Sequence, residues 1–232
     1  MKPVLVSAAG ESLPEVEERV QRRFRDVLNA LRLLKSGGVE IRTFHYHPYS
    51  PRTDESDITD EFVLVKPLAI CKEGMYKLDV KDVSRVKLLL SQVSETADAK
   101  FQRALHRFNV AYLDYRLDDK LIDNVIALEA LLLPEKQELG LRLAMRSACL
   151  FAEAGRREAV FEFVRVAYDY RSDLVHGGEP DLSKKIKCDQ KEYSAHEFVM
   201  TLQNLVRKAI CLRLERPDLF TQSGLARLNP FK

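Results

Sequence analysis

From about residue 81 onward, the apolar residues of this chain recur at intervals of three and four, the spacing of one helix face. A cap or a breaker ends each stretch: Thr96, Leu117-Asp118, Pro134, Gly155, Gly177-Gly178 and Pro217. Short links between long helices favour antiparallel neighbours in a bundle. The pattern predicts helices over residues 81–93, 97–115, 119–133, 136–153, 156–176 and 192–215, with one long polar loop over 177–191.

The first 80 residues follow a different pattern. Ser12 and Glu15 have the spacing of a capping box, and the helical apolar series after them stops at Gly37-Gly38. Residues 39–47 and 62–70 have the composition of strands, and 75–80 of a shorter one. We therefore expect a mainly α protein. A small α+β region over residues 1–94 precedes a helical bundle over 95–216, and a tail follows over 217–232.

Composition narrows the class of protein. The chain is 46% hydrophobic and 31% charged, as globular proteins are, and its net charge of +2 gives no overall attraction for nucleic acid. No apolar run approaches the ~20 residues of a membrane span, and the N-terminus lacks the features of a secretory signal. The cysteines are scattered without a CxxC pair. We expect a cytoplasmic protein without membrane association.

Several catalytic signatures are absent from the sequence. There is no GxxxxGK[ST] loop, no GxGxxG, no HExxH and no GxSxG. These absences argue against a nucleotide hydrolase, a dehydrogenase, a zinc protease and a serine hydrolase. We expect neither a metal site nor another cofactor.

The end of the helix predicted over 156–176 carries the best candidate chemistry. Arg171 and His176 lie just before Gly177-Gly178. An imidazole can move protons near neutral pH, and a guanidinium fits phosphate oxygens in pairs. The pair could therefore cleave RNA without a metal, or it could be an ordinary helix terminus. Five residues turn an ideal helix through ~500°, which leaves the two side chains ~140° apart. A shared site then requires the helix to end at His176, or a second chain to complete the cleft.

This stretch resembles the Arg-x4–6-His motif of HEPN domains. The similarity extends to the Apea-like group, through FQRALHRFNVAYLDYRLDDKLIDNVIALEALLL (101–133), ELGLRLAMRSACLFA (138–152) and VFEFVRVAYDYRSDLVHGG (160–178). It covers roughly residues 97–215. The resemblance implies a homodimer whose motif helices face each other across a cleft.

In active members of the family, the resemblance implies a metal-independent endoribonuclease. Its products carry a 2′,3′-cyclic phosphate and a 5′-hydroxyl. Arg171 is then the cation at the phosphate and His176 the general acid and base. Ser172 takes the polar place after the arginine, and Asp173 and Tyr168 complete the supporting set.

Glu129 interrupts the apolar run IALEALLL, where a charge is costly unless it is paired. It resembles the acidic residue of the family's LEALL segment, and so is a candidate catalytic carboxylate that orients Arg171 or polarises His176. A structural ion pair with Arg142 or Arg146 is the alternative.

Basic residues near the motif offer contacts for RNA phosphates. Arg142 and Arg146 lie one helical turn apart, and the basic segment KKIK occupies 184–187. Salt bridges at the surface and a solvated loop are the respective alternatives. The candidate RNA-binding residues are Arg142, Arg146, Lys184, Lys185 and Lys187.

Two functions follow from these features. The first is an endoribonuclease that acts in phage defence or as a toxin, with an antitoxin or a sensor as a possible partner. The second is a non-catalytic HEPN module that binds RNA, a nucleotide or a protein.

Overall fold

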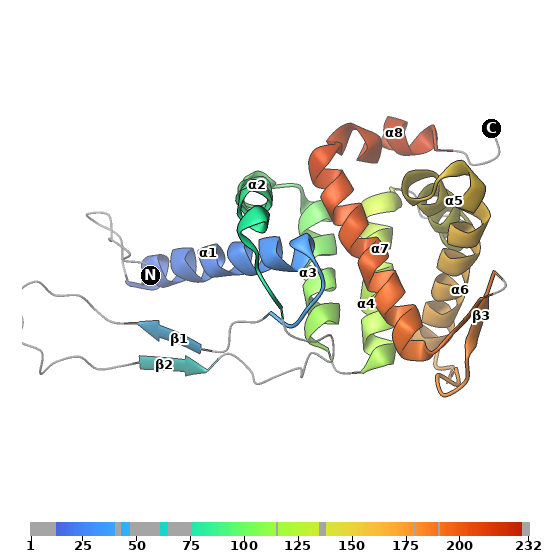
Figure 1. The fold of residues 1–232 in the computed structure, drawn as a ribbon, viewed down its shortest axis with the longest axis horizontal. Helices are drawn as coiled ribbons and strands as arrows, with labels where there is room; N and C mark the ends of the chain where they lie inside the picture. The colour runs from blue at the N-terminus through green and yellow to red at the C-terminus, as the bar shows by residue number, and fades with distance from the viewer. Residues whose placement is uncertain are drawn as a thin grey trace, which may run out of the picture. The chain divides into compact units, whose positions relative to one another are not determined.

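The computed structural model describes residues 13–39, 43–46, 61–64, 76–114, 116–134, 138–178, 180–189 and 191–228. It is mainly helical, as predicted: a helical bundle preceded by a small α+β region (Figure 1). The chain divides into two compact units, Met1–Val86 and Lys87–Lys232.

The boundary between the units falls inside helix α2 (Val83–Glu95), earlier than the expected residue 94. Leu89 and Val93 of this helix are buried, and the Gln92 side-chain amide donates a 3.5 Å hydrogen bond to the Leu214 carbonyl oxygen. Most of α2 therefore belongs to the helical bundle.

The first unit contains α1 (Leu13–Leu34) and an antiparallel pair of strands, β1 (Thr43–Tyr46) and β2 (Glu61–Leu64), in which Thr43 faces Leu64. The Arg32 side chain is buried and donates to the Val39 carbonyl oxygen, and the Tyr76 hydroxyl donates to the Leu31 carbonyl oxygen at 2.7 Å. The Leu31 carbonyl is one of the last four of α1, which have no partner within the helix, and the Arg32 bond holds the segment that follows the helix.

The short strand expected over 75–80 was wrong for residues 76–79, which are irregular and lead into the 3₁₀ turn η2 (Val80–Asp82). No strand among the described residues pairs with them, and Leu78 and Val80 are exposed, so neither a ladder nor a buried face stabilises a strand. The cap at Ser12 and the strand residues 65–70 lie outside the described residues.

The second unit packs its helices in antiparallel pairs. Helix α3 (Ala99–Leu113) packs on α4 (Leu117–Leu132), and α5 (Leu139–Phe151) packs on α6 (Arg157–Val175), after the 3₁₀ turn η3 (Ala154–Arg156). Helix α7 (Ala195–Glu215) crosses α4 and α3 (Figure 1). Each helix starts and ends within three residues of its predicted bounds, because caps and breakers are local signals.

The core lies where α7 meets the other helices. It is made of apolar side chains that are fully or almost fully buried, each stabilising the fold by about 1.5–3 kcal/mol relative to an exposed position. Its largest members include Phe101, Phe108, Leu121, Leu128, Leu143 and Phe198.

Two segments are more ordered than predicted. The polar loop expected over 177–191 contains the strand β3 (Ile186–Cys188), which pairs antiparallel with β4 (Lys191–Tyr193). Ile186 and Cys188 are buried while Lys187 between them is exposed, so a period-two pattern was present but too short to stand out.

The tail expected over 217–232 is a 3₁₀ turn, η4 (Pro217–Phe220), and a short helix, α8 (Gln222–Ala226). Phe220 and Leu225 are buried, and the Arg213 guanidinium of α7 lies 5.8 Å from the Phe220 ring centroid. These two apolar side chains hold the segment against the bundle, which explains why it folds.

Candidate functional site

Helix α6 ends in a Schellman motif at the candidate site. Its last helical residue is Val175, and His176 is the C-cap residue with φ −90° and ψ 12°. The Gly178 N–H donates to the Asp173 carbonyl oxygen at 2.8 Å, and the Gly177 N–H donates to that of Leu174 at 3.4 Å. Gly177 has a φ of +85°, which favours glycine. The helix thus ends at His176, one of the two arrangements that a shared site would require.

Arg171 and His176 nevertheless lie on different sides of α6. Phe163, Val164 and Ala167 are the buried residues of the helix, and Arg171 follows Ala167 by one turn on this inner side. The outer side carries exposed polar residues, and His176 is exposed as well. Within the described part of the chain, no hydrogen bond or ion pair joins the two side chains. One copy of the chain therefore leaves them as separate groups.

Arg171 reaches across to α4. Its Nη2 atom lies 3.3 Å from Oε2 of Glu129, and the two side chains are only 21% and 16% exposed, respectively. Arg142 and Arg146 were the alternative partners from the sequence, but the structure has the pair with Arg171. Removing both charges from water is costly, so each depends on the other.

The pair has unused hydrogen-bonding capacity. Oε1 of Glu129 and Nε of Arg171 are buried and have no hydrogen-bond partner among the described residues. Burial raises the pKa of the Glu129 carboxyl, and the Arg171 guanidinium opposes this effect. The carboxylate is thus held by a single charge-assisted contact.

Tyr168 connects this pair to α5. The Arg171 guanidinium carbon lies 5.9 Å from the centroid of the Tyr168 ring, within the range of a cation–π contact. A Cβ atom on Gly140 of α5 would lie 2.6 Å from Cδ1 of the same ring. The absence of a side chain at Gly140 therefore lets Tyr168 lie between the two helices beside Arg171.

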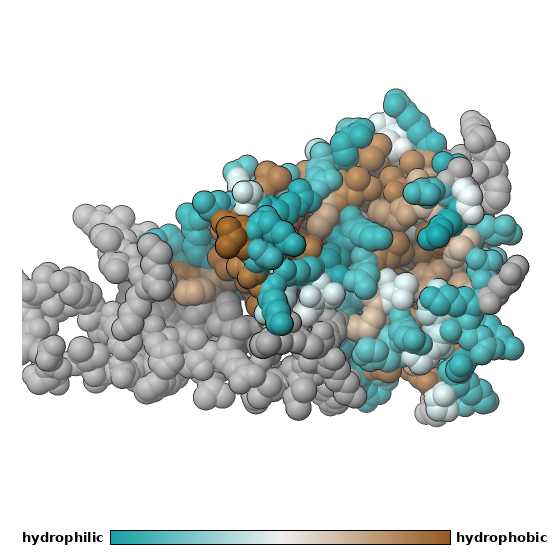
Figure 2. Space-filling model, in the orientation of Figure 1, coloured by the Kyte–Doolittle hydropathy of each residue, from teal (hydrophilic) through white to brown (hydrophobic). Residues whose placement is uncertain are grey.

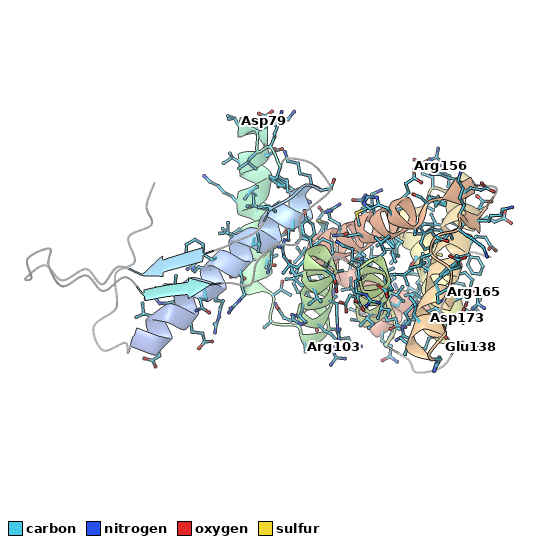
Figure 3. All side chains as sticks on the ribbon, turned by 90° about the horizontal axis from the view of Figure 1, so that it is seen from below. Asp79, Arg103, Glu138, Arg156, Arg165 and Asp173 are labelled. Atoms are coloured by element: carbon cyan, nitrogen blue, oxygen red, sulfur yellow. The ribbon has the colours of Figure 1, made fainter. Side chains whose placement is uncertain are left out.

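Ser172 and Asp173, the other supporting residues, accept hydrogen bonds at the end of α6 through their backbone carbonyl oxygens. Ser172 is half-buried and Asp173 exposed, and the Ser172 carbonyl oxygen accepts the His176 N–H at 3.0 Å. Asp173 and Glu138 lie at the same end of the bundle, where α6 ends and α5 begins (Figure 3).

The predicted role of Arg146 in RNA binding is corrected by its burial. Its side chain is 4% exposed, and Nη1 donates a 2.6 Å hydrogen bond to the Leu132 carbonyl oxygen at the end of α4. Arg142 is half-buried and pairs with Glu138 at 3.2 Å. The two arginines share a helix, but Arg146 contacts the end of α4 instead of facing solvent.

The lysines of the segment 184–187 are exposed but lie among carboxylates. Lys184 is 3.2 Å from Asp181, while Lys185 and Lys187 are 3.9 and 3.5 Å from Glu192. Hydrophilic side chains predominate on the visible face of this end of the bundle (Figure 2). Carboxylates offset the lysine charges, which weakens the attraction of this segment for phosphate.

An open hollow of about 390 Å³ lies between α6 and the hairpin formed by β3 and β4. Burial raises the pKa of the Cys188 thiol in its lining to about 11, and the nearby Glu162 and Asp189 act in the same direction. A thiol that keeps its proton is a poor nucleophile. The lining residues are Glu162, Lys187, Cys188, Asp189, Lys191 and Glu192.

Among the described residues, no group of three or more His, Cys, Asp and Glu side chains could hold a metal ion. None of the helices there is both long and apolar enough to cross a bilayer.

Comparison of the chain with models of protein families, with curated proteins and with solved structures gives no match. The resemblance to Apea-like HEPN domains therefore rests on the sequence segments quoted above.

Proposed function

We propose that this chain is a metal-independent endoribonuclease of the cytoplasm, acting in phage defence or as a toxin. The 2′-hydroxyl of a ribose attacks the adjacent phosphorus, and the bond to the 5′-oxygen of the next nucleotide breaks. His176 takes the 2′-hydroxyl proton or supplies one to the leaving oxygen, and Arg171 stabilises the negative phosphoryl oxygens. The products are a 2′,3′-cyclic phosphate and a 5′-hydroxyl.

The observation that carries the proposal is the arrangement at the end of α6. Arg171 is held by Glu129 at 3.3 Å and by the Tyr168 ring, while the exposed His176 caps the same helix. A cation with a restrained position and an accessible imidazole are the two groups that this chemistry uses. The unused Nε donor of Arg171 is a further hydrogen bond available to a phosphate after a small movement.

Arg171 and His176 lie on different sides of α6, and this separation suggests how copies of the chain assemble. An imidazole on the outer side of α6 and a guanidinium on its inner side form one site only when another surface brings them together. We propose a homodimer in which the ends of the α6 helices from two copies face each other. An antitoxin or a sensor would bind to the same assembly, with RNA as substrate.

The experiment is RNA cleavage in EDTA. Wild-type protein and the variants Arg171→Lys and His176→Ala are incubated with total RNA, and the fragment ends are examined for 2′,3′-cyclic phosphate. His196→Ala is the matched control, because His196 is also an exposed imidazole, on the first turn of α7. Cleavage that persists in EDTA, survives His196→Ala and is lost in the other two variants supports the proposal. Cleavage that His176→Ala leaves intact contradicts it.

One observation favours a second function. The Arg171 side chain is only 21% exposed and already contacts a carboxylate, so it is less available than a phosphate-binding arginine at an open surface. This favours a non-catalytic module that binds RNA, a nucleotide or a protein. RNA binding by the wild type, unchanged by His176→Ala and without cleavage, would support this second function.

A further inference from the structure

Helix α3 has an unbalanced charge along its length. Its 15 residues, AKFQRALHRFNVAYL, include two arginines, a lysine and a histidine but no aspartate or glutamate. We name these four residues, Lys100, Arg103, His106 and Arg107, the α3 ridge. The absence of acidic residues from 99 to 113 is visible in the sequence, but the residues predicted to bind RNA do not include these four.

The ridge residues lie on the solvent side of the helix. Lys100, Arg103 and His106 are exposed, and Arg107 is half-buried. At 100° per residue, Lys100, Arg103 and Arg107 fall within about 60° of one another, with His106 about 60° from Arg103 on the other flank. Arg103 extends outward from α3, away from the rest of the bundle (Figure 3).

Most of this charge is not offset by neighbouring carboxylates. Arg107 pairs with Asp123 of α4 at 2.7 Å. For Lys100, Arg103 and His106, no carboxylate in the described part of the chain lies within the 4.0 Å of an ion pair. Asp98, at the start of the helix, is bound by Arg213 at 2.9 Å. The segment 184–187 differs, since each of its lysines has a carboxylate nearby.

Acidic residues limit the ridge at one end. Four aspartates lie near the connection between α3 and α4: Asp114, Asp118, Asp119 and Asp123. Burial is the largest cause of the raised pKa of the Asp119 carboxyl, and the charges of the other three aspartates raise it further. The positive stretch therefore runs from Lys100 to Arg107, about 10 Å along the helix axis. At the rise of ~3.4 Å per phosphate of a stacked strand, this length fits about three phosphates.

The chemistry of the ridge selects among anionic ligands. A membrane-binding helix needs an exposed apolar face, but the apolar side chains of α3 are mostly buried in the bundle: Phe101, Ala104, Leu105, Phe108, Ala111 and Tyr112. Hot spots of protein interfaces are enriched in Trp, Tyr and Arg, and the aromatic residues of α3 (Phe101, Phe108 and Tyr112) are buried, which leaves only polar and charged anchors on the ridge. A row of cations without an exposed aromatic anchor suits a flexible polyanion.

We infer that the α3 ridge is a docking surface for the ribose–phosphate backbone of single-stranded RNA. The choice of RNA as the polyanion rests on the proposed function, but binding to the ridge requires no cleavage. The ridge supplies position and affinity without base selectivity, because contacts to phosphates carry no sequence information.

The test is binding of a fluorescent 2′-O-methyl RNA oligonucleotide, which lacks the attacking hydroxyl and cannot be cut. The full chain is compared with Lys100→Gln/Arg103→Gln over a series of salt concentrations. Arg22→Gln/Arg216→Gln is the matched control: both arginines are exposed and paired with a carboxylate, and each double variant lowers the formal net charge from +2 to zero. Thermal unfolding of all three proteins checks that the exposed substitutions leave the fold intact.

The ridge variant is expected to bind roughly ten-fold more weakly at low salt, and its log K against log salt slope to be shallower by about 1.4, or 0.7 for each lost phosphate contact. The control variant is expected to change affinity less than three-fold. The inference is overturned if the wild type does not bind the RNA, if the ridge variant binds it as tightly as the wild type, or if the control variant loses as much affinity as the ridge variant. So does ridge-dependent binding to anionic phosphatidylserine vesicles or to poly-glutamate in the absence of RNA binding.

The binding experiment can be interpreted even if the protein does not cleave RNA. Ridge-dependent binding without cleavage supports the docking surface and removes the endoribonuclease. Cleavage without ridge-dependent binding supports the enzyme and removes the docking surface.

Discussion

Glu129 of α4 and Arg171 of α6 form an ion pair of 3.3 Å between residues 42 positions apart, with both side chains mostly removed from water. The contact ties the candidate catalytic arginine to the interior of the bundle. Any substitution of Arg171 therefore changes stability as well as chemistry, and the two effects must be measured separately.

Breaking this pair from one side is expected to destabilise the fold. Arg171→Met leaves the Glu129 carboxylate buried without its partner, so we expect a loss of about 2 kcal/mol in the free energy of unfolding by urea. The double variant Glu129→Leu/Arg171→Met removes both charges and recovers most of this loss. Arg165→Met is the control, since the exposed pair of Arg165 with Asp169 at 3.9 Å contributes below about 0.5 kcal/mol. A double variant as unstable as the sum of its single variants contradicts the coupling.

Glu129 also predicts a pH dependence of stability. Burial raises its pKa in the folded protein above 4.5, so the folded state holds this proton more tightly than the unfolded chain. The contribution of Glu129 is then fully present below the unfolded pKa and is lost as pH rises through the folded pKa. Relative to Glu129→Gln, which cannot titrate, the wild type should lose stability as pH rises above 4.5. A difference that moves the other way contradicts the sign of the shift.

The close approach of α5 and α6 at Gly140 is a packing prediction. In Gly140→Ala the new Cβ lies 2.6 Å from the Tyr168 ring, and the ring must move, at a cost of about 1–3 kcal/mol measured by thermal unfolding. Gly155→Ala is the matched control, because no atom lies within 4 Å of its added Cβ; it should be neutral or slightly stabilising. Combining Gly140→Ala with Tyr168→Leu should cost less than the sum of the two changes.

Gly177 makes a purely conformational prediction. Nothing lies within 4 Å of a Cβ added there, but its φ of +85° strains any other residue. Gly177→Ala should cost about 1–2 kcal/mol, and Gly177→Asn should cost less, because asparagine tolerates this region. Urea unfolding of both variants measures the order. Equal stability of the alanine and asparagine variants would show that the backbone at the end of α6 relaxes on substitution.

Local signals predicted the helices well and the longer-range features poorly. The helix bounds near 132 and 175 follow from Pro134 and Gly177, breakers within two residues of each end. The sequence predicts a loop over 177–191 and a helix from 192 instead of the β3–β4 hairpin, because the strands are short and Asp189, rather than glycine, adopts the positive φ of 44° beside the turn. The sequence predicts a tail after Pro217 because two apolar residues, Phe220 and Leu225, are too few to form a period.

Residues close together along the chain account for the order of the helices, the end of α6 at His176 and the lack of acidic residues on α3, since each depends on neighbours within one or two turns. Only the packing of the helices explains why Glu129 pairs with Arg171, why Arg146 is buried against the end of α4, and why Lys100 and Arg103 face solvent without an acidic partner among the described residues. These outcomes depend on which helices pack together, because burial and ion pairing join residues that lie far apart along the chain.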